Sequence, residues 1–160
     1  MGRSLRTFSL LKGLPVFEIK TGEKIGEVSD LTISNDGKVK GLLVKNGVFF
    51  IKPKMISIQN VSSFGNDGVM LEDRELLEPF QNNVDYTFEN QDRLQGRIIM
   101  TKEGERLGIL EDVYFLEEMG TIVGYELSDG FFSDIIDGKR VVKTDVAPAI
   151  GKDAIIVNVK

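Results

Sequence analysis

Apolar residues occur along this chain in short runs separated by turn residues, a pattern that predicts β-strands rather than helices. The longest such stretch runs from Lys24 to Ser34. Its apolar positions, spaced by three, three and two residues, are Ile25, Val28, Leu31 and Ile33. Strict alternation does not produce this spacing, and the glycine and β-branched residues disfavour a helix. A β-bulge accounts for the spacing, because one extra residue reverses the side to which later side chains point.

Turn sequences divide the rest of the first half into short segments. Three of them are Asn35-Asp36-Gly37, Asn46-Gly47 and Asn66-Asp67-Gly68. Asp-Gly and Asn-Gly pairs favour tight hairpin turns, because both residues tolerate the positive φ values that such turns need. About six short strands with turns at regular spacing are typical of an all-β barrel or sandwich.

One stretch of the sequence occurs twice. Residues 21–31 read TGEKIGEVSDL and residues 103–113 read EGERLGILEDV. Three pairs of equivalent residues are each 82 positions apart: Gly22 and Gly104, Gly26 and Gly108, Asp30 and Asp112. A fixed internal offset indicates a duplicated unit. We therefore predict an all-β fold of two small six-stranded β-barrels at 8–72 and 94–160, joined by an acidic linker at 73–93.

The repeated unit resembles the PRC-barrel domain family. The resemblance rests on Gly13-Leu14-Pro15-Val16, on Gly22-Glu23-Lys24-Ile25-Gly26 with Val28-Ser29-Asp30, and on Gly37-Lys38-Val39-Lys40-Gly41. It implies a small β-barrel without shared catalytic residues. The family is named for the H subunit of the photosynthetic reaction centre, and a related domain in a ribosome maturation factor docks on a ribosomal protein. The tandem arrangement resembles an uncharacterised cytosolic type found in Gram-positive bacteria.

Composition excludes several kinds of chemistry. The chain contains neither Cys nor His. Disulfides, zinc-thiolate sites and the Ser-His or Cys-His catalytic arrangements are therefore impossible. We expect no metal, no cofactor and no enzymatic activity. Absence of Cys fits a reducing cytoplasm, and no apolar run is long enough to span a membrane.

Charge is unevenly distributed along the chain. The net charge is −5 overall; residues 1–71 contribute 10 − 6 = +4, residues 72–93 contribute −5 and residues 94–160 contribute −4. We therefore expect an anionic partner to bind the first repeat, through Lys38, Lys40 and Lys52 beside an exposed member of the pair Phe49 and Phe50. The acidic whole favours a protein partner, with RNA bound only indirectly or weakly and DNA not at all. The same lysines could instead protect strand edges from aggregation.

The repeated aspartates and glycines allow both structural and functional interpretations. Asp30 and Asp112 could bind a metal or act as bases, or could accept backbone N–H groups that a bulge leaves unpaired. The repeated glycines fit turns and close strand packing, since their spacing matches no phosphate-binding motif. A non-catalytic interaction module and a small-ligand-binding or enzymatic protein using Asp and Lys groups both remain possible. A polar pocket with groups of perturbed pKa would favour the second.

Overall fold

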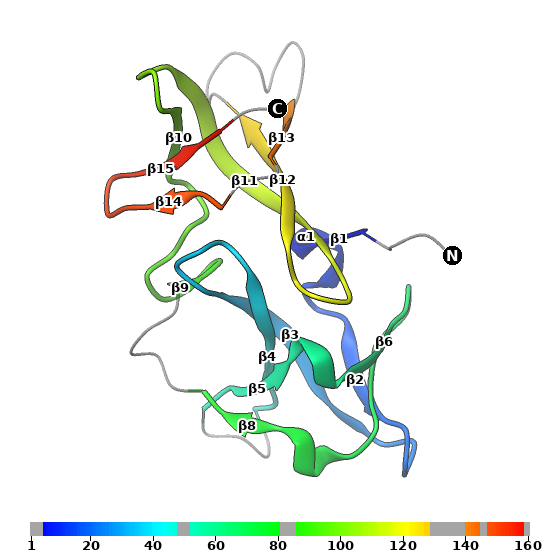
Figure 1. The fold of residues 1–160 in the computed structure, drawn as a ribbon. Coiled ribbons are helices and arrows are strands. Elements are labelled where there is room, and N and C mark those ends of the chain that lie inside the picture. The colour runs from blue at the N-terminus through cyan, green and yellow to red at the C-terminus, as the bar shows by residue number, and fades with distance from the viewer. Residues whose placement is uncertain (1–4, 48–51, 81–85, 129–139, 145–146, 159–160) are drawn as a thin grey trace.

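The computed structural model describes residues 5–47, 52–80, 86–128, 140–144 and 147–158. Within these residues the chain forms two β-sheets, one for each repeat, with a single short α-helix, α1 (Phe8–Leu11). Figure 1 shows the two sheets as separate halves of the molecule, with α1 lying between them on the side of the second repeat. Phe49 and Phe50 lie outside the described residues.

The first sheet contains seven strands of the first half in the order β6-β7-β2-β3-β4-β5-β8. Their bounds are β2 (Pro15–Glu18), β3 (Lys24–Ile33), β4 (Val39–Lys45), β5 (Lys54–Ser57), β6 (Val61–Phe64), β7 (Val69–Leu71) and β8 (Glu78–Pro79). Strands β2 and β7 pair in parallel, and the other neighbours pair antiparallel. Two 3-10 turns, η1 (Ile58–Asn60) and η2 (Arg74–Leu76), connect strands at its edges.

The second sheet repeats this arrangement in the order β14-β15-β10-β11-β12-β13. Its strands are β10 (Ile98–Thr101), β11 (Arg106–Leu116), β12 (Ile122–Ser128), β13 (Arg140–Lys143), β14 (Ala149–Ile150) and β15 (Ala154–Val157). Here β10 and β15 are the parallel pair, as β2 and β7 are in the first sheet. The same order of six strands in both halves confirms the predicted all-β duplication.

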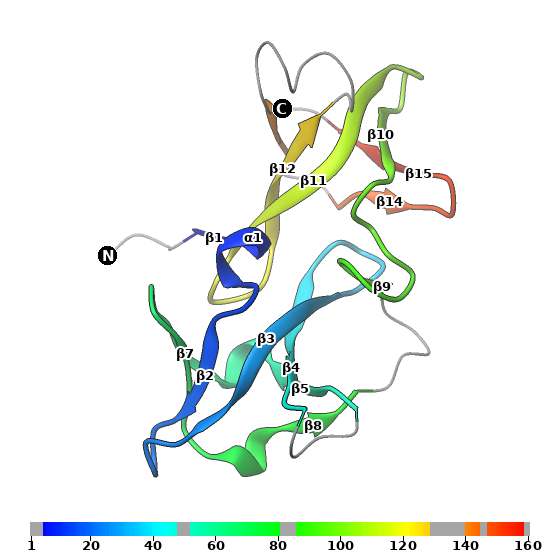
Figure 2. The same cartoon turned by 180° about the vertical axis from the view of Figure 1, so that it is seen from behind.

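The first strand of each repeat pairs with the sheet of the other repeat. Strand β1 (Leu5–Thr7) pairs antiparallel with β11, and β9 (Tyr86–Thr87) pairs antiparallel with β3. Figures 1 and 2 show β1 and α1 beside the upper sheet although the chain then enters the lower one. Each sheet is therefore completed by a segment from the other half of the chain.

The long strands β3 and β11 are irregular at equivalent positions. The register between β3 and β4 shifts between Val28 and Asp30, and the register between β11 and β12 shifts between Leu110 and Asp112. A second pair of shifts lies between Thr32 and Ile33 and between Tyr114 and Phe115. These shifts account for the apolar spacing of three, three and two residues.

One apolar core runs through both repeats. Buried side chains of the two sheets form a single cluster that includes Phe8, Phe88, Phe64 and Phe115. The rings of Phe8 and Phe88 pack edge to face at 5.1 Å between centroids, and each belongs to the leading segment of its repeat. Burying these rings at the junction stabilises the contact between the repeats. Among the described residues, no helix is long and apolar enough to cross a membrane.

Candidate functional site

Asp112 ties the leading segment of the first repeat to the long strand of the second. Its Oδ1 atom accepts hydrogen bonds from the backbone N–H groups of Phe8 (3.0 Å) and Val113 (2.8 Å). The N–H of Ser9 lies 3.3 Å from each carboxylate oxygen. The side chain is 4% exposed. Both oxygens of this buried carboxylate are therefore used at the first turn of α1.

Asp30 makes the equivalent contacts in the opposite direction. Its Oδ1 atom accepts from the N–H groups of Leu31 (2.8 Å) and Glu89 (2.9 Å), and Oδ2 accepts from the N–H (3.0 Å) and side-chain Nδ2 (2.7 Å) of Asn90. The side chain is fully buried. We call the two arrangements the aspartate clamps, because each holds the leading segment of one repeat on the bulged strand of the other.

The clamps satisfy the carboxylates with uncharged donors, which are backbone N–H groups and the Asn90 side-chain amide. Within the described part of the chain, no group of three or more acidic side chains could hold a metal ion. Ion pairs reinforce the junction: Arg6 Nε lies 2.7 Å from Glu117 Oε2, and Lys12 pairs with Glu89. The arrangement therefore fixes the two repeats relative to each other.

A short β-bridge continues the junction at the tips of the two hairpins. Lys38 and Thr121 pair as an isolated antiparallel bridge, and the N–H of Val39 donates to the carbonyl of Gly120 at 2.7 Å. Val39 pairs with Ile33 and Ile122 pairs with Phe115 in equivalent registers. Lys38 and Thr121 precede these residues, so the bridge joins equivalent positions of the two repeats.

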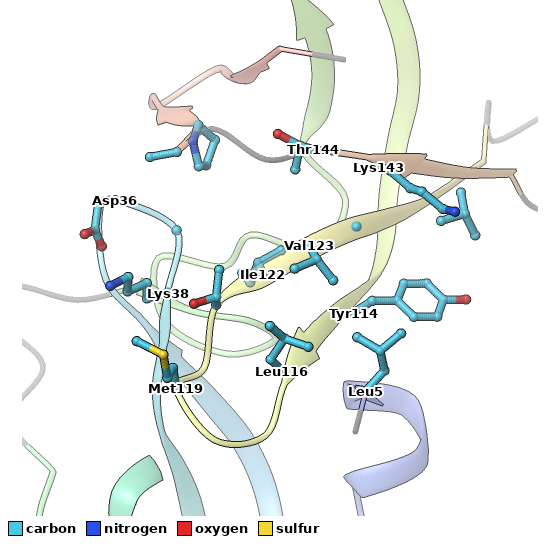
Figure 3. Close-up of a pocket in the computed structure, with 16 residues that line it drawn as sticks. Leu5, Asp36, Lys38, Tyr114, Leu116, Met119, Ile122, Val123, Lys143 and Thr144 are labelled. Carbon is cyan, nitrogen blue, oxygen red and sulfur yellow. The ribbon is translucent and has the colours of Figure 1, made fainter. Parts of the chain in front are cut away.

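A groove of about 770 Å³ opens beside this bridge. We call it the inter-repeat groove, and Figure 3 shows its lining. Its larger apolar lining residues are Leu5, Leu116, Met119, Ile122, Val123 and Val141. The turn at Gly37 closes against Pro148, since a Cβ on Gly37 would lie 2.6 Å from Cδ of Pro148. The groove is therefore built from β1, the two hairpins and β13.

Three apolar side chains of the groove are exposed to an unusual degree. Leu5 is 52% exposed, Met119 63% and Val141 46%. These side chains share one groove instead of lying scattered over the surface, which makes the groove a candidate binding site. The free energy of covering these side chains is therefore available to a ligand.

The charged and polar groups of the groove lie toward its two ends. Asp36 and Lys38 lie at one end and Lys143 and Tyr114 at the other (Figure 3). The Tyr114 hydroxyl donates to Glu126 Oε1 at 3.0 Å. Burial, followed by this hydrogen bond and the charge of Glu126, raises the pKa of Tyr114 above its usual value. Tyr114 therefore keeps its proton at neutral pH.

A smaller hollow of about 290 Å³ shares Asp36, Lys38 and Met119 with the groove. It is lined by the equivalent positions of the first repeat, but these are more polar. Lys40 in the hollow corresponds to Val123 in the groove, and Ser34 corresponds to Leu116. The two repeats thus present a polar and an apolar version of the same surface.

The structure brings together only part of the predicted lysine surface. Lys38 and Lys40 are exposed on the same face of the chain, with buried Val39 between them. Lys52 lines a different hollow with Pro53 and Phe80. Lys38 is therefore the member of the set that also lines the inter-repeat groove.

The repeated glycines lie at turns and at close approaches between strands. Gly22 and Gly104 have φ values of +74° and +89°, which glycine adopts without strain. A Cβ on Gly26 would lie 2.5 Å from the carbonyl oxygen of Lys45, and one on Gly108 would lie 2.8 Å from that of Ser128. These positions leave no room for a side chain.

Sequence reasoning missed the apolar lining of the groove. A signal was present in the internal comparison, because Leu116 and Val123 are apolar where their equivalents Ser34 and Lys40 are polar. Apolar residues at positions that are polar in the other repeat indicate that the two equivalent surfaces have different binding properties. No such signal marks Leu5 as a lining residue, because Leu5 reaches the groove only through the pairing of β1 with β11 of the second sheet.

Comparison with known proteins places both repeats in one family. The PRC-barrel domain model matches residues 5–78 and 87–160. The chain is also 33% identical over 158 residues to "Uncharacterized protein YrrD" of Bacillus subtilis (strain 168), an alignment that covers 97% of this chain and 88% of that protein. Neither match gives a sign of catalysis. The chain belongs to the PRC-barrel domain family, with two copies of the domain in tandem.

Proposed function

We propose that this protein is a non-catalytic interaction module that binds a protein partner in the inter-repeat groove. The observation that carries the proposal is the exposed apolar lining formed by Leu5, Met119 and Val141 at the junction of the repeats. Burial of apolar surface is the dominant favourable contribution to most protein–protein association. The family and the relative indicate no reaction that would require a catalytic site.

The Asp112 clamp and the β-bridge support this proposal because they hold the two walls of the groove in place. Asp112 fixes the segment that carries Leu5, and the bridge between Lys38 and Thr121 fixes the two hairpins. A preformed groove lowers the entropic cost of binding, because few residues must become ordered when the partner arrives. The duplication then has a functional role, since one repeat alone does not build the groove.

A small-ligand-binding function is the second candidate. The volume of about 770 Å³ lies within the range of small-molecule sites. An enzymatic function has less support, because the raised pKa makes Tyr114 a hydrogen-bonding group rather than a base at neutral pH. Native mass spectrometry of the protein purified from its own cell would reveal a retained small molecule.

Exchange of equivalent residues provides the test for the protein partner. Val123→Lys gives the groove the residue that the first repeat already carries as Lys40 at the equivalent position, so we expect the variant to fold. We expect this change to abolish recovery of partners by the immobilised protein, whereas Lys52→Glu in the separate hollow leaves recovery unchanged. Loss of partners with Lys52→Glu but not with Val123→Lys would move the site to the lysine surface of the first repeat.

A further inference from the structure

The charges of the inter-repeat groove differ in sign from those of the molecule. The chain has a net charge of −5. The charged side chains that line the groove are Asp36, Lys38 and Lys143, which gives −1 + 2 = +1. Lys40 adds a further positive charge in the adjoining hollow. With Lys40, and with Glu126 that accepts the Tyr114 hydroxyl at the other end, the sum is 3 − 2 = +1, so the groove is weakly cationic on an acidic protein and favours anionic groups.

Both lysines are available to a ligand within the described part of the chain. Neither Lys38 nor Lys143 forms one of the ion pairs there, and both side chains are exposed. The carboxylate of Asp36 accepts a hydrogen bond from the Ser34 hydroxyl within its own turn. At the other end of the groove, Glu126 accepts the hydroxyl proton of Tyr114.

The apolar surface lies between these cations. Leu116 is drawn between the Lys38 end and the Lys143 end in Figure 3, with Met119 near the first and Leu5 near the second. A ligand that covers the apolar residues therefore brings its own ends close to the lysines. Opposite charge at those ends is favoured and like charge is penalised, which gives selectivity more than affinity.

We propose that the groove selects an acidic segment of a partner protein, one in which an aliphatic or aromatic side chain stands beside carboxylates. Apolar side chains of the segment pack in turn on Met119, Leu116 and Val141 along the groove, and its carboxylates reach Lys38 at one end or Lys143 at the other. This inference rests on the proposed function, because it names the chemistry of the partner that the same groove binds.

Selection of peptides from a random displayed library tests the inference on the full chain. Parallel selections use the wild-type protein, Val123→Lys and the double variant Lys38→Glu with Lys143→Glu. We expect wild-type selections to enrich peptides that combine large apolar residues with Asp or Glu. Val123→Lys should lose these peptides, and the double variant should turn the enrichment toward Lys and Arg. Circular dichroism and melting temperature confirm that each variant is folded.

A synthesised peptide from the wild-type selection then measures how much each lysine contributes to the affinity. Each single change, Lys38→Glu or Lys143→Glu, should weaken its binding about twofold to fivefold at low salt, the range expected for the loss of an exposed ion pair. High salt should reduce the difference, because it screens exposed charges. Lys102→Glu, in the turn between β10 and β11, serves as the control and should leave the affinity unchanged.

The outcomes separate the inference from the function on which it rests. Peptides that depend on Val123 but show no excess of acidic residues overturn the charge selectivity and leave the interaction module in place. Absence of any peptide that depends on Val123 overturns both. Displacement of a selected peptide by an RNA homopolymer would show that the lysines recognise phosphate, which also contradicts the inference.

Discussion

At the residue scale, the buried aspartates connect parts of the chain that are far apart in sequence. Asp112 accepts backbone N–H groups from Phe8 and Ser9, about a hundred positions earlier, and Asp30 accepts from Glu89 and Asn90. Each carboxylate also accepts from the residue that follows it in its own strand. Each aspartate side chain therefore accepts hydrogen bonds both from its own irregular strand and from the segment of the other repeat that packs on that strand.

Replacement of Asp112 by alanine should destabilise the whole protein. The change leaves the N–H groups of Phe8 and Val113 buried without an acceptor, which costs on the order of 2–4 kcal/mol. Urea denaturation should show this loss in the free energy of unfolding, with Asp112→Asn intermediate because its amide oxygen still accepts. Asp153→Ala, at an exposed position, is the control. An unchanged stability for Asp112→Ala would contradict the clamp.

Glu18 should make the stability of the protein depend on acid pH. Its carboxylate accepts hydrogen bonds from the side chain of Arg74, from Thr21 and from the Arg74 backbone, in that order of effect, and these lower its pKa from 4.5 to about 2. A lowered pKa means that the folded state favours the ionised form. The stabilisation is therefore complete above pH 4.5 and is lost as the pH falls toward about 2.

Thermal unfolding at a series of acid pH values tests this expectation. Glu18→Gln should lower the melting temperature at neutral pH and flatten its decline between pH 4.5 and about 2. The second repeat provides a comparison, because Thr101 stands where the first repeat has Glu18. An equal decline in the Glu18→Gln variant would assign the acid sensitivity to other carboxylates.

At the element scale, the long irregular strands were predictable and the short exchanged ones were not. The spacing of Ile25, Val28, Leu31 and Ile33 recurs in the second repeat, so the bulge could be predicted from the sequence. Strand β1 has three residues and β9 has two. Segments of this length carry no periodicity, and their pairing is set by contacts with residues distant in sequence.

The candidate site was likewise predictable from the sequence only in part. Lys38 was predicted as part of a binding surface from charge alone, and the structure places it in the groove. Met119 and Val141 both belong to the second repeat, whereas Leu5 joins them only because β1 pairs with β11. Hydrophobic patterning identifies which residues are apolar, but not which of them remain exposed once two units have docked.

At the scale of the whole molecule, the pairing of β1 and β9 with the opposite sheets leads us to expect that the two repeats unfold as one cooperative unit. Leu5–Thr7 belongs to the first half and pairs with the second sheet, while Tyr86–Thr87 does the reverse. The shared core includes Phe8 and Phe88 in direct contact. Neither half contains all the strands of its own sheet, so we expect the folding of each half to depend on the other.

Division of the chain tests this dependence most directly. Fragments 1–83 and 84–160 should each lack a stable fold, because 1–83 leaves Asp30 without Glu89 and Asn90, and 84–160 leaves Asp112 without Phe8. When mixed, they should form a one-to-one complex whose circular dichroism and cooperative melting match the intact chain. Analytical ultracentrifugation gives the stoichiometry. Asp112→Ala in the second fragment should weaken the complex about tenfold or more, which corresponds to at least about 1.4 kcal/mol. If either fragment alone unfolds cooperatively as a monomer with the stability of the full chain, the exchanged strands are accessory and the repeats are independent domains.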